Sequence, residues 1–244
     1  MQGVVGVPET WTVRARNLAE HAGNPIHTDA GAQAAGFPAA LVAGVTTYAY
    51  LTHPVVAAWG LDWVAGGGAE VRFDAPVFEH DDVSCSPVVE GDAVVVRALV
   101  GYDGVQRASL RAIRDGGPPP APREGTPLTS RRVELADRWG VDYGERAGDD
   151  LDVYRHDGVV HPAVWPALAN HVVAADLVHG AWVHLRSRVR HHDLAAAGSV
   201  ADLRAVVVDR FQRRSGERAI VDVVIEVDGR PIATLEHEAI IALP

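Results

Sequence analysis

Lysine is absent from this 244-residue sequence, so all 22 of its basic residues are arginine. Without lysine the protein cannot form a Schiff base with a carbonyl substrate, and it cannot build a Walker-type phosphate-binding loop. Acidic residues outnumber basic ones by 32 to 22, which gives a formal net charge of −10 at neutral pH. That charge disfavours nucleic acids and anionic membrane surfaces as partners.

Cysteine and long apolar runs are also scarce. Cys85 is the only cysteine, so no intrachain disulfide can form, and a reducing cytoplasm is the expected location. The first residues show neither the basic nor the apolar part of a secretory signal, and the longest apolar run, 39–51, is too short to span a bilayer. None of the histidines has a zinc-binding spacing and no cysteine cluster accompanies them, so no metal site is expected.

Composition divides the chain nearly in half. The segment Gly116–Pro127 contains five prolines and three glycines, which is typical of a semi-rigid linker. We therefore predict an N-terminal unit over residues 1–115, a linker over 116–130 and a C-terminal unit over 131–244.

The two halves repeat one pattern of elements. In each half an apolar helix is predicted, at 39–51 and at 162–178, and Pro54 is expected to break the first one. Four segments of strand character follow each helix, at 69–78, 82–89, 92–102 and 105–114, and at 181–190, 199–211, 218–227 and 231–243. Glycine-containing turns between them favour antiparallel pairing.

The most informative segment is Gly23–Gly31, GNPIHTDAG. It begins with a rigid turn that ends in the imidazole of His27, because Pro25 fixes its own φ and restricts Asn24. Asp29 is expected to cap a short alanine-rich helix that follows. The segment resembles the hydratase segment of the MaoC-like enoyl-thioester hydratases and dehydratases, in which G-D-x-N-P-[LIV]-H precedes a helix rich in alanine and phenylalanine. The matching residues are Asn24, Pro25, Ile26, His27, Asp29, Ala34 and Phe37.

The resemblance implies a fold and a set of site residues. The implied fold is α+β, with two tandem hot-dog units that each wrap an antiparallel sheet around a long central helix. His27 would be the general acid and base, with Asn24 positioning it. The backbone N–H of Gly44 would donate to the thioester oxygen, and Ala43 stands where the family has a histidine. Tyr48 would line or close an acyl tunnel or simply fill the core, as would Tyr50, Trp59 and Trp63.

One residue of the family pattern is missing, the aspartate five positions before the histidine. Ala22 stands there. When the two halves are aligned on His161-Pro162-Ala163 over Phe37-Pro38-Ala39, Asp149 falls over Ala22 and Tyr154 falls over His27, while Leu168 falls over Gly44. Asp149 could therefore complement His27 across the two units, or it could be a capping or solvated carboxylate. Glu20 and His21, within one helical turn of Asn24, are the other candidates for the missing acid.

These residues predict an acyl-thioester hydratase or dehydratase, which adds or removes water across an α,β double bond and needs no cofactor. The substrate would be carried by coenzyme A or by a carrier protein, whose phosphates could meet Arg72, Arg188 and Arg190 unless these arginines are simply solvated. Two alternatives stay open: an acyl-thioester-binding or partner subunit with little or no activity, and a hot-dog thioesterase. A homodimer or association with a partner subunit is compatible with the sequence.

Overall fold

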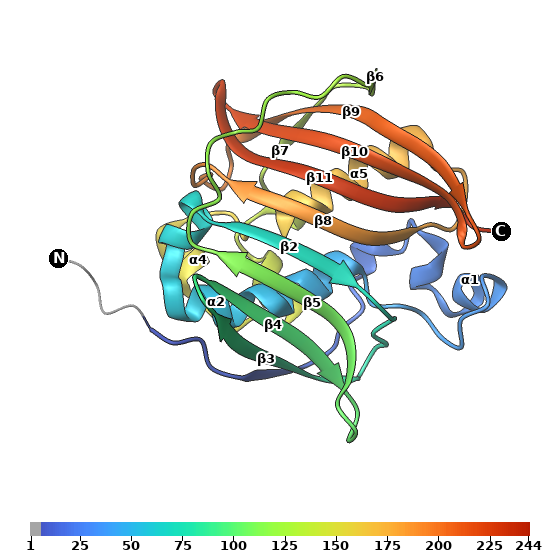
Figure 1. Ribbon diagram of the computed structural model, residues 1–244, viewed down its shortest axis with the longest axis horizontal. Helices are drawn as coiled ribbons and strands as arrows, with labels where there is room; N and C mark the ends of the chain where they lie inside the picture. The colour runs from blue at the N-terminus through green and yellow to red at the C-terminus, as the bar shows by residue number, and fades with distance from the viewer. Residues whose placement is uncertain (1–5) are drawn as a thin grey trace.

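The computed structural model describes residues 6–244. Within that range, eleven strands form one continuous antiparallel sheet with the order β1-β3-β4-β5-β2-β8-β11-β10-β9-β6, and β7 also pairs with β9 (Figure 1). The order is symmetric about the contact between β2 and β8. On one side β2 is followed by β5, β4, β3 and β1, and on the other side β8 is followed by β11, β10, β9 and β7. The sheet therefore consists of two equivalent halves that are joined edge to edge.

The strands lie close to the predicted positions. The N-terminal half contributes β1 (Trp11–Arg14), β2 (Gly68–Phe73), β3 (Asp82–Glu90), β4 (Ala93–Val100) and β5 (Val105–Ile113). The C-terminal half contributes β7 (Arg131–Glu134), β8 (Val183–His191), β9 (Val200–Arg213), β10 (Gly216–Val227) and β11 (Arg230–Ala242). Alternation of buried and half-buried residues is clearest in β10, because one face of the sheet packs on the helices.

Two apolar helices, α2 (Gly44–Gly66) and α5 (Val164–Leu177), lie on the same side of the sheet (Figure 1). Every residue from Val45 to Val56 in α2 is buried, so this helix forms the centre of the core. The predicted break at Pro54 is wrong. The helix continues through the proline, which is enclosed by the core, and is interrupted at Gly60, where φ is +66°.

Short helices flank the central ones. Before α2 lie η1 (Ala19–His21), η2 (Pro25–His27) and α1 (Asp29–Ala34), and before α5 lie η3 (Asp137–Trp139), α3 (Tyr143–Ala147) and α4 (Val153–Asp157). The predicted cap of α1 is wrong by one residue. The hydroxyl of Thr28 accepts the N–H of Gly31, whereas the carboxylate of Asp29 accepts the N–H of Ala40 and closes the following loop.

The proline-rich segment connects the two halves of the sheet and is partly ordered by it. It contains the short strand β6 (Thr126–Pro127), which pairs with Val206 and Val207 of β9. The segment therefore ends beside β9, the outermost of the four long strands of the C-terminal half (Figure 1).

Candidate functional site

The turn Asn24–His27 is fixed to the C-terminal half. Asn24 is 9% exposed, and its side-chain amide donates to the backbone oxygen of Trp182 over 2.9 Å. The oxygen of the same amide accepts the N–H of Trp182 and that of Ile26, at 3.4 and 3.5 Å. Because Trp182 directly precedes β8, this side chain holds the turn 24–27 of one unit against the sheet of the other.

His27 is oriented by one strong hydrogen bond. Its Nδ1 lies 2.7 Å from the backbone oxygen of Leu41, so Nδ1 carries the proton and donates it. Nε2 is then the ring nitrogen that is free to act as a base. Burial lowers the pKa of His27, and the hydrogen bond to Leu41 partly opposes this effect. The imidazole is consequently neutral at physiological pH.

Gly44 is the first residue of α2, where the backbone N–H groups have no acceptor within the helix. The positive end of the helix dipole also lies there and favours developing negative charge. A methyl group on Cα of Gly44 would lie 3.3 Å from ring carbons of Phe73 and 3.4 Å from Nδ1 of His184. The absence of a side chain at Gly44 therefore leaves space between the start of α2, Phe73 and His184.

One cavity of about 190 Å³ brings the three groups together. It is lined by Asn24, His27 and Gly44 from the N-terminal half and by Asn170, Trp182 and His184 from the C-terminal half, along with the loop after β2. Three of the five predicted site residues thus share one cavity, and this cavity lies between the two units.

Two other predicted substrate contacts lie outside it. Ala43 is buried and caps α2, since its carbonyl accepts the N–H groups of Thr46 and Thr47. Tyr48 is fully buried in the main core, where burial raises its pKa, and it is not among the residues that line the cavity. Tyr50 and Trp63 are likewise core residues.

The candidates for the missing acid also lie elsewhere. The carboxylate of Glu20 forms an ion pair with Arg146 at 3.0 Å. His21 lies 6.0 Å from His27, measured between ring centroids, and burial together with the neighbouring His27 lowers its pKa to about 3. Ala22 is exposed. None of these three residues lines the cavity in the described part of the chain.

Asp149 belongs to a separate buried cluster. Nε2 of His161 donates to its carboxylate over 3.1 Å, and the Nδ1 of His161 accepts the N–H of Ala163. The other oxygen of Asp149 lies 3.8 Å from Nε2 of His53, which also contacts Asp150 at 2.7 Å. The potential ligand atoms of His53, Asp149 and Asp150 lie within 4.8 Å of one another, a grouping that sequence spacing does not reveal. Each carboxylate already has a histidine as its hydrogen-bond partner: His161 for Asp149 and His53 for Asp150.

Three of the polar residues that line the cavity, besides Thr47, were not predicted from the sequence. Asn170 on α5 has a buried side-chain oxygen without a hydrogen-bond partner among the described residues. Asp74 lies at the exposed rim and accepts from Gln106. His184 lies on β8 and is 7% exposed. Nothing in the local sequence marks these residues, because the contact between the two halves is what brings them to His27.

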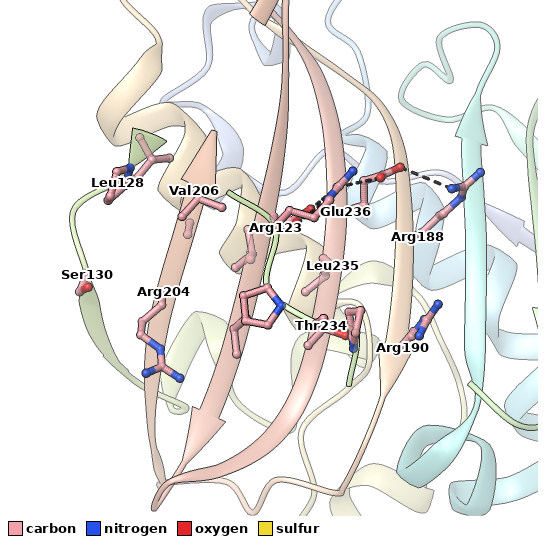
Figure 2. A pocket seen from close by; sticks show the side chains of 18 residues that line it. Arg123, Leu128, Ser130, Arg188, Arg190, Arg204, Val206, Thr234, Leu235 and Glu236 are labelled. Atoms are coloured by element: carbon pink, nitrogen blue, oxygen red, sulfur yellow. Dashed lines mark hydrogen bonds and ion pairs between the residues drawn. The ribbon is translucent and has the colours of Figure 1, made fainter. Parts of the chain in front are cut away.

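A larger cavity of about 670 Å³ lies on the other face of the sheet, under the proline-rich segment (Figure 2). Arg188 and Arg190 line it, but both have internal partners: Arg188 contacts Glu70 and Glu236, and Arg190 donates to the backbone oxygen of Pro118. Arg72 pairs with Glu70. The described helices include none that is long and apolar enough to cross a membrane.

Comparison with known proteins finds a family similarity in the N-terminal half of the chain. Residues 10–106 match the family model described as the MaoC like domain. The sequence of this part of the chain is therefore similar to that of a MaoC-like domain. The matched part contains β1, the His27 turn, α2 and most of the N-terminal sheet. No curated protein matches the sequence.

Solved structures extend the similarity in fold to the second half of the chain. A MaoC domain protein from Chloroflexus aurantiacus J-10-fl is 13% identical, with a TM-score of 0.62 and coverage of 96% of this chain and 95% of that one. A conserved protein from Mycobacterium tuberculosis with a double hotdog fold is 11% identical, with a TM-score of 0.63 and 96% coverage of each chain. The dehydratase domain of PpsC from Mycobacterium tuberculosis, in complex with C12:1-CoA, is 11% identical, with a TM-score of 0.57 and coverage of 96% and 93%. The predicted α+β fold, a double hot dog, is confirmed.

Proposed function

We propose that this MaoC-like protein is an acyl-thioester hydratase or dehydratase and that the cavity between its two units is the active site. The observation that carries the proposal is the meeting of His27 and Gly44 in one cavity. Nδ1 of His27 is fixed on Leu41, which leaves Nε2 for proton transfer, and Gly44 presents the start of α2. A base and an anion-stabilising helix end are the two functions that hydration of an enoyl thioester requires.

The reaction can be written with His27 as the one proton carrier. Nε2 takes a proton from water while the water oxygen bonds to Cβ of the enoyl group, and the electron pair of the double bond moves toward the thioester carbonyl. Cα then takes the proton back from the His27 imidazolium, and dehydration is the reverse. Because burial lowers the pKa of His27, its imidazolium gives up a proton more readily, which favours the transfer of that proton to Cα. No carboxylate at position 22 is needed.

The dehydratase family model and the neighbour bound to C12:1-CoA support an acyl-CoA substrate. The side chains of Thr47 and Asn170 lie in the same cavity and could hold the attacking water. We propose no role for a cofactor or a metal in this reaction.

The test is turnover of crotonyl-CoA and longer enoyl-CoA esters by the wild-type protein and by His27→Ala. Hydration removes the ultraviolet absorbance of the conjugated thioester. We expect His27→Ala to lower kcat/KM by about 10²-fold or more, as is typical for loss of a general acid-base group. The exposed His179→Ala is the matched control and should keep full activity.

Three results contradict the proposal. Release of free thiol in place of hydration would indicate a thioesterase, and binding without turnover would indicate an acyl-thioester-binding subunit. Equal activity of His27→Ala and the wild-type protein would move the reaction away from this cavity.

A further inference from the structure

His184 faces the same cavity as His27 from the opposite unit, and its surroundings are unusual. The residue lies on β8, where it is 7% exposed, and its Nδ1 is buried without a hydrogen-bond partner among residues 6–244. The same Nδ1 lies beside Gly44, 3.4 Å from the position that a methyl group on that glycine would occupy. A buried polar atom without a partner costs free energy. It therefore points to a ligand that supplies the missing hydrogen bond.

An irregularity in β8 places His184 in this position. Residues three apart on a regular strand point to opposite faces of the sheet. In the pairing of β8 with β11, Arg186 lies opposite Glu238 and His184 opposite Ala239, so Leu185 is an extra residue and the strand has a β-bulge. The bulge brings His184 and Ser187 to the same inner face, where both are buried.

Behind His184 runs a chain of hydrogen bonds. Nε2 of His184 lies 2.8 Å from the hydroxyl oxygen of Ser187, and that oxygen lies 2.9 Å from Nδ1 of His237. The two imidazole rings stack with centroids 4.1 Å apart. Nε2 of His237 is buried and has no partner in the described part of the chain.

The hydrogen bonds that link His184, Ser187 and His237 can run in either of two directions, and each direction leaves a different nitrogen unpaired. The free-energy cost of that unpaired nitrogen decides between them. In one arrangement His237 donates to Ser187, Ser187 donates to His184, and His184 keeps its proton on Nδ1, facing the cavity. Nδ1–H of His184 can then meet an acceptor in the cavity, and the atom of this hydrogen-bond chain that stays enclosed without a partner among residues 6–244 is the lone pair on Nε2 of His237. The reverse arrangement leaves an N–H of His237 without an acceptor, which is rarer in proteins than an unpaired acceptor. We therefore assign the first arrangement.

We propose that Nδ1–H of His184 is a second hydrogen-bond donor to the thioester carbonyl, beside the N–H of Gly44, and that Ser187 and His237 position it. This inference rests on the proposed function of the cavity. As water adds to Cβ, negative charge develops on the carbonyl oxygen, and two donors aimed at it stabilise that charge. His184 would be a catalytic residue contributed by the C-terminal unit, and Ser187 and His237 would be positioning residues.

The protonation state agrees with this role. Burial, and next the neighbouring His237, hold the pKa of His184 well below its usual range. The ring is therefore neutral at physiological pH and donates as an imidazole, without exchanging protons with His27.

The test compares four variants, Ser187→Ala among them, by their effect on bound crotonyl-CoA. His184→Leu removes the donor, whereas His184→Asn keeps an amide N–H near the place of Nδ1. The matched control is His191→Leu, because His191 is a buried histidine of the same strand that lies outside the cavity. The readouts are kcat/KM and the infrared frequency of an isotope-labelled thioester carbonyl, which falls when the oxygen accepts hydrogen bonds.

We expect the wild-type protein and His191→Leu to lower the carbonyl frequency of the bound thioester. His184→Leu should lose most of that shift and about 10²-fold in kcat, the usual effect of removing one oxyanion donor, while His184→Asn should recover part of both. Ser187→Ala, which keeps the ring but frees its orientation, should lose part of the shift and serves if His184→Leu does not fold.

Two outcomes overturn the inference, and they can be told apart. If the wild-type protein hydrates crotonyl-CoA, His27→Ala does not, and the His184 and Ser187 variants keep the full carbonyl shift, only the role of His184 is refuted. If the wild-type protein neither binds nor polarises crotonyl-CoA, the proposed function fails and the role of His184 fails with it.

Discussion

At the scale of single residues, Gly44 both begins the helix α2 and leaves space for a substrate carbonyl in the cavity. Its missing side chain leaves room between Phe73 and His184. The sequence pointed to this residue through the family resemblance, although the predicted helix began at Ala39 and the helix of the structure begins at Gly44. It could not find His184, because the β-bulge and the contact between the two units that expose this ring to the cavity depend on tertiary structure.

Gly44→Ala separates these two roles. The added methyl group is in tight but tolerable contact with Phe73 and His184, and alanine is about 1 kcal/mol better than glycine within a helix. We therefore expect the free energy of unfolding to change by less than about 1 kcal/mol, while kcat/KM for crotonyl-CoA falls by at least about tenfold because the methyl group fills the carbonyl position. Urea unfolding and hydration kinetics measure the two effects.

Gly66→Ala is the matched control for this substitution. It also lies in α2, and a methyl group there has no neighbour within 4 Å. It should leave hydration unchanged. Equal activity of both alanine variants would argue against Gly44 as part of the carbonyl site.

At the scale of elements, the sequence predicted the repeated helix-and-sheet pattern but not how the elements meet. Alternation and glycine turns located the strands, because these signals are local. The helix α2 was predicted too short, because Pro54 suggested an end that the surrounding core does not allow. The contact of the His27 turn with β8 also escaped prediction, because Asn24 and Trp182 are 158 residues apart.

Asn24→Ala tests that contact. It removes a buried hydrogen bond between the two units and leaves the carbonyl of Trp182 unpaired, which costs about 1–3 kcal/mol. We expect lower stability in urea unfolding together with reduced hydration, since the turn that carries His27 loses its support. Asn17→Ala is the control: it loses a partly buried hydrogen bond to the backbone of His27 within the same unit and should cost less. A variant at position 24 with wild-type stability and activity would refute the structural role.

At the scale of the whole molecule, the interior holds several histidines in the neutral form. Burial is the main cause in each case, and it lowers the pKa of His21, His191 and His237 to about 3 from the ordinary value of 6.5. In the unfolded chain the same rings take up protons as the pH falls below 6.5. Between about pH 3 and pH 6.5 the unfolded state therefore binds more protons than the folded state, so acid destabilises the fold. The stability that comes from neutral burial is complete above pH 6.5 and is lost as the pH falls.

We expect the free energy of unfolding in urea to be nearly constant above about pH 7 and to fall steeply between about pH 6.5 and 5, by about 1.4 kcal/mol per pH unit for each such histidine. His191→Leu is the most direct variant, because both ring nitrogens of His191 lack partners among the described residues. It should reduce the slope by the contribution of one histidine and leave hydration at neutral pH unchanged. An unchanged slope would mean that His191 is protonated in the folded protein, which its enclosure in the core argues against: a charged ring there would have to be buried without a counterion.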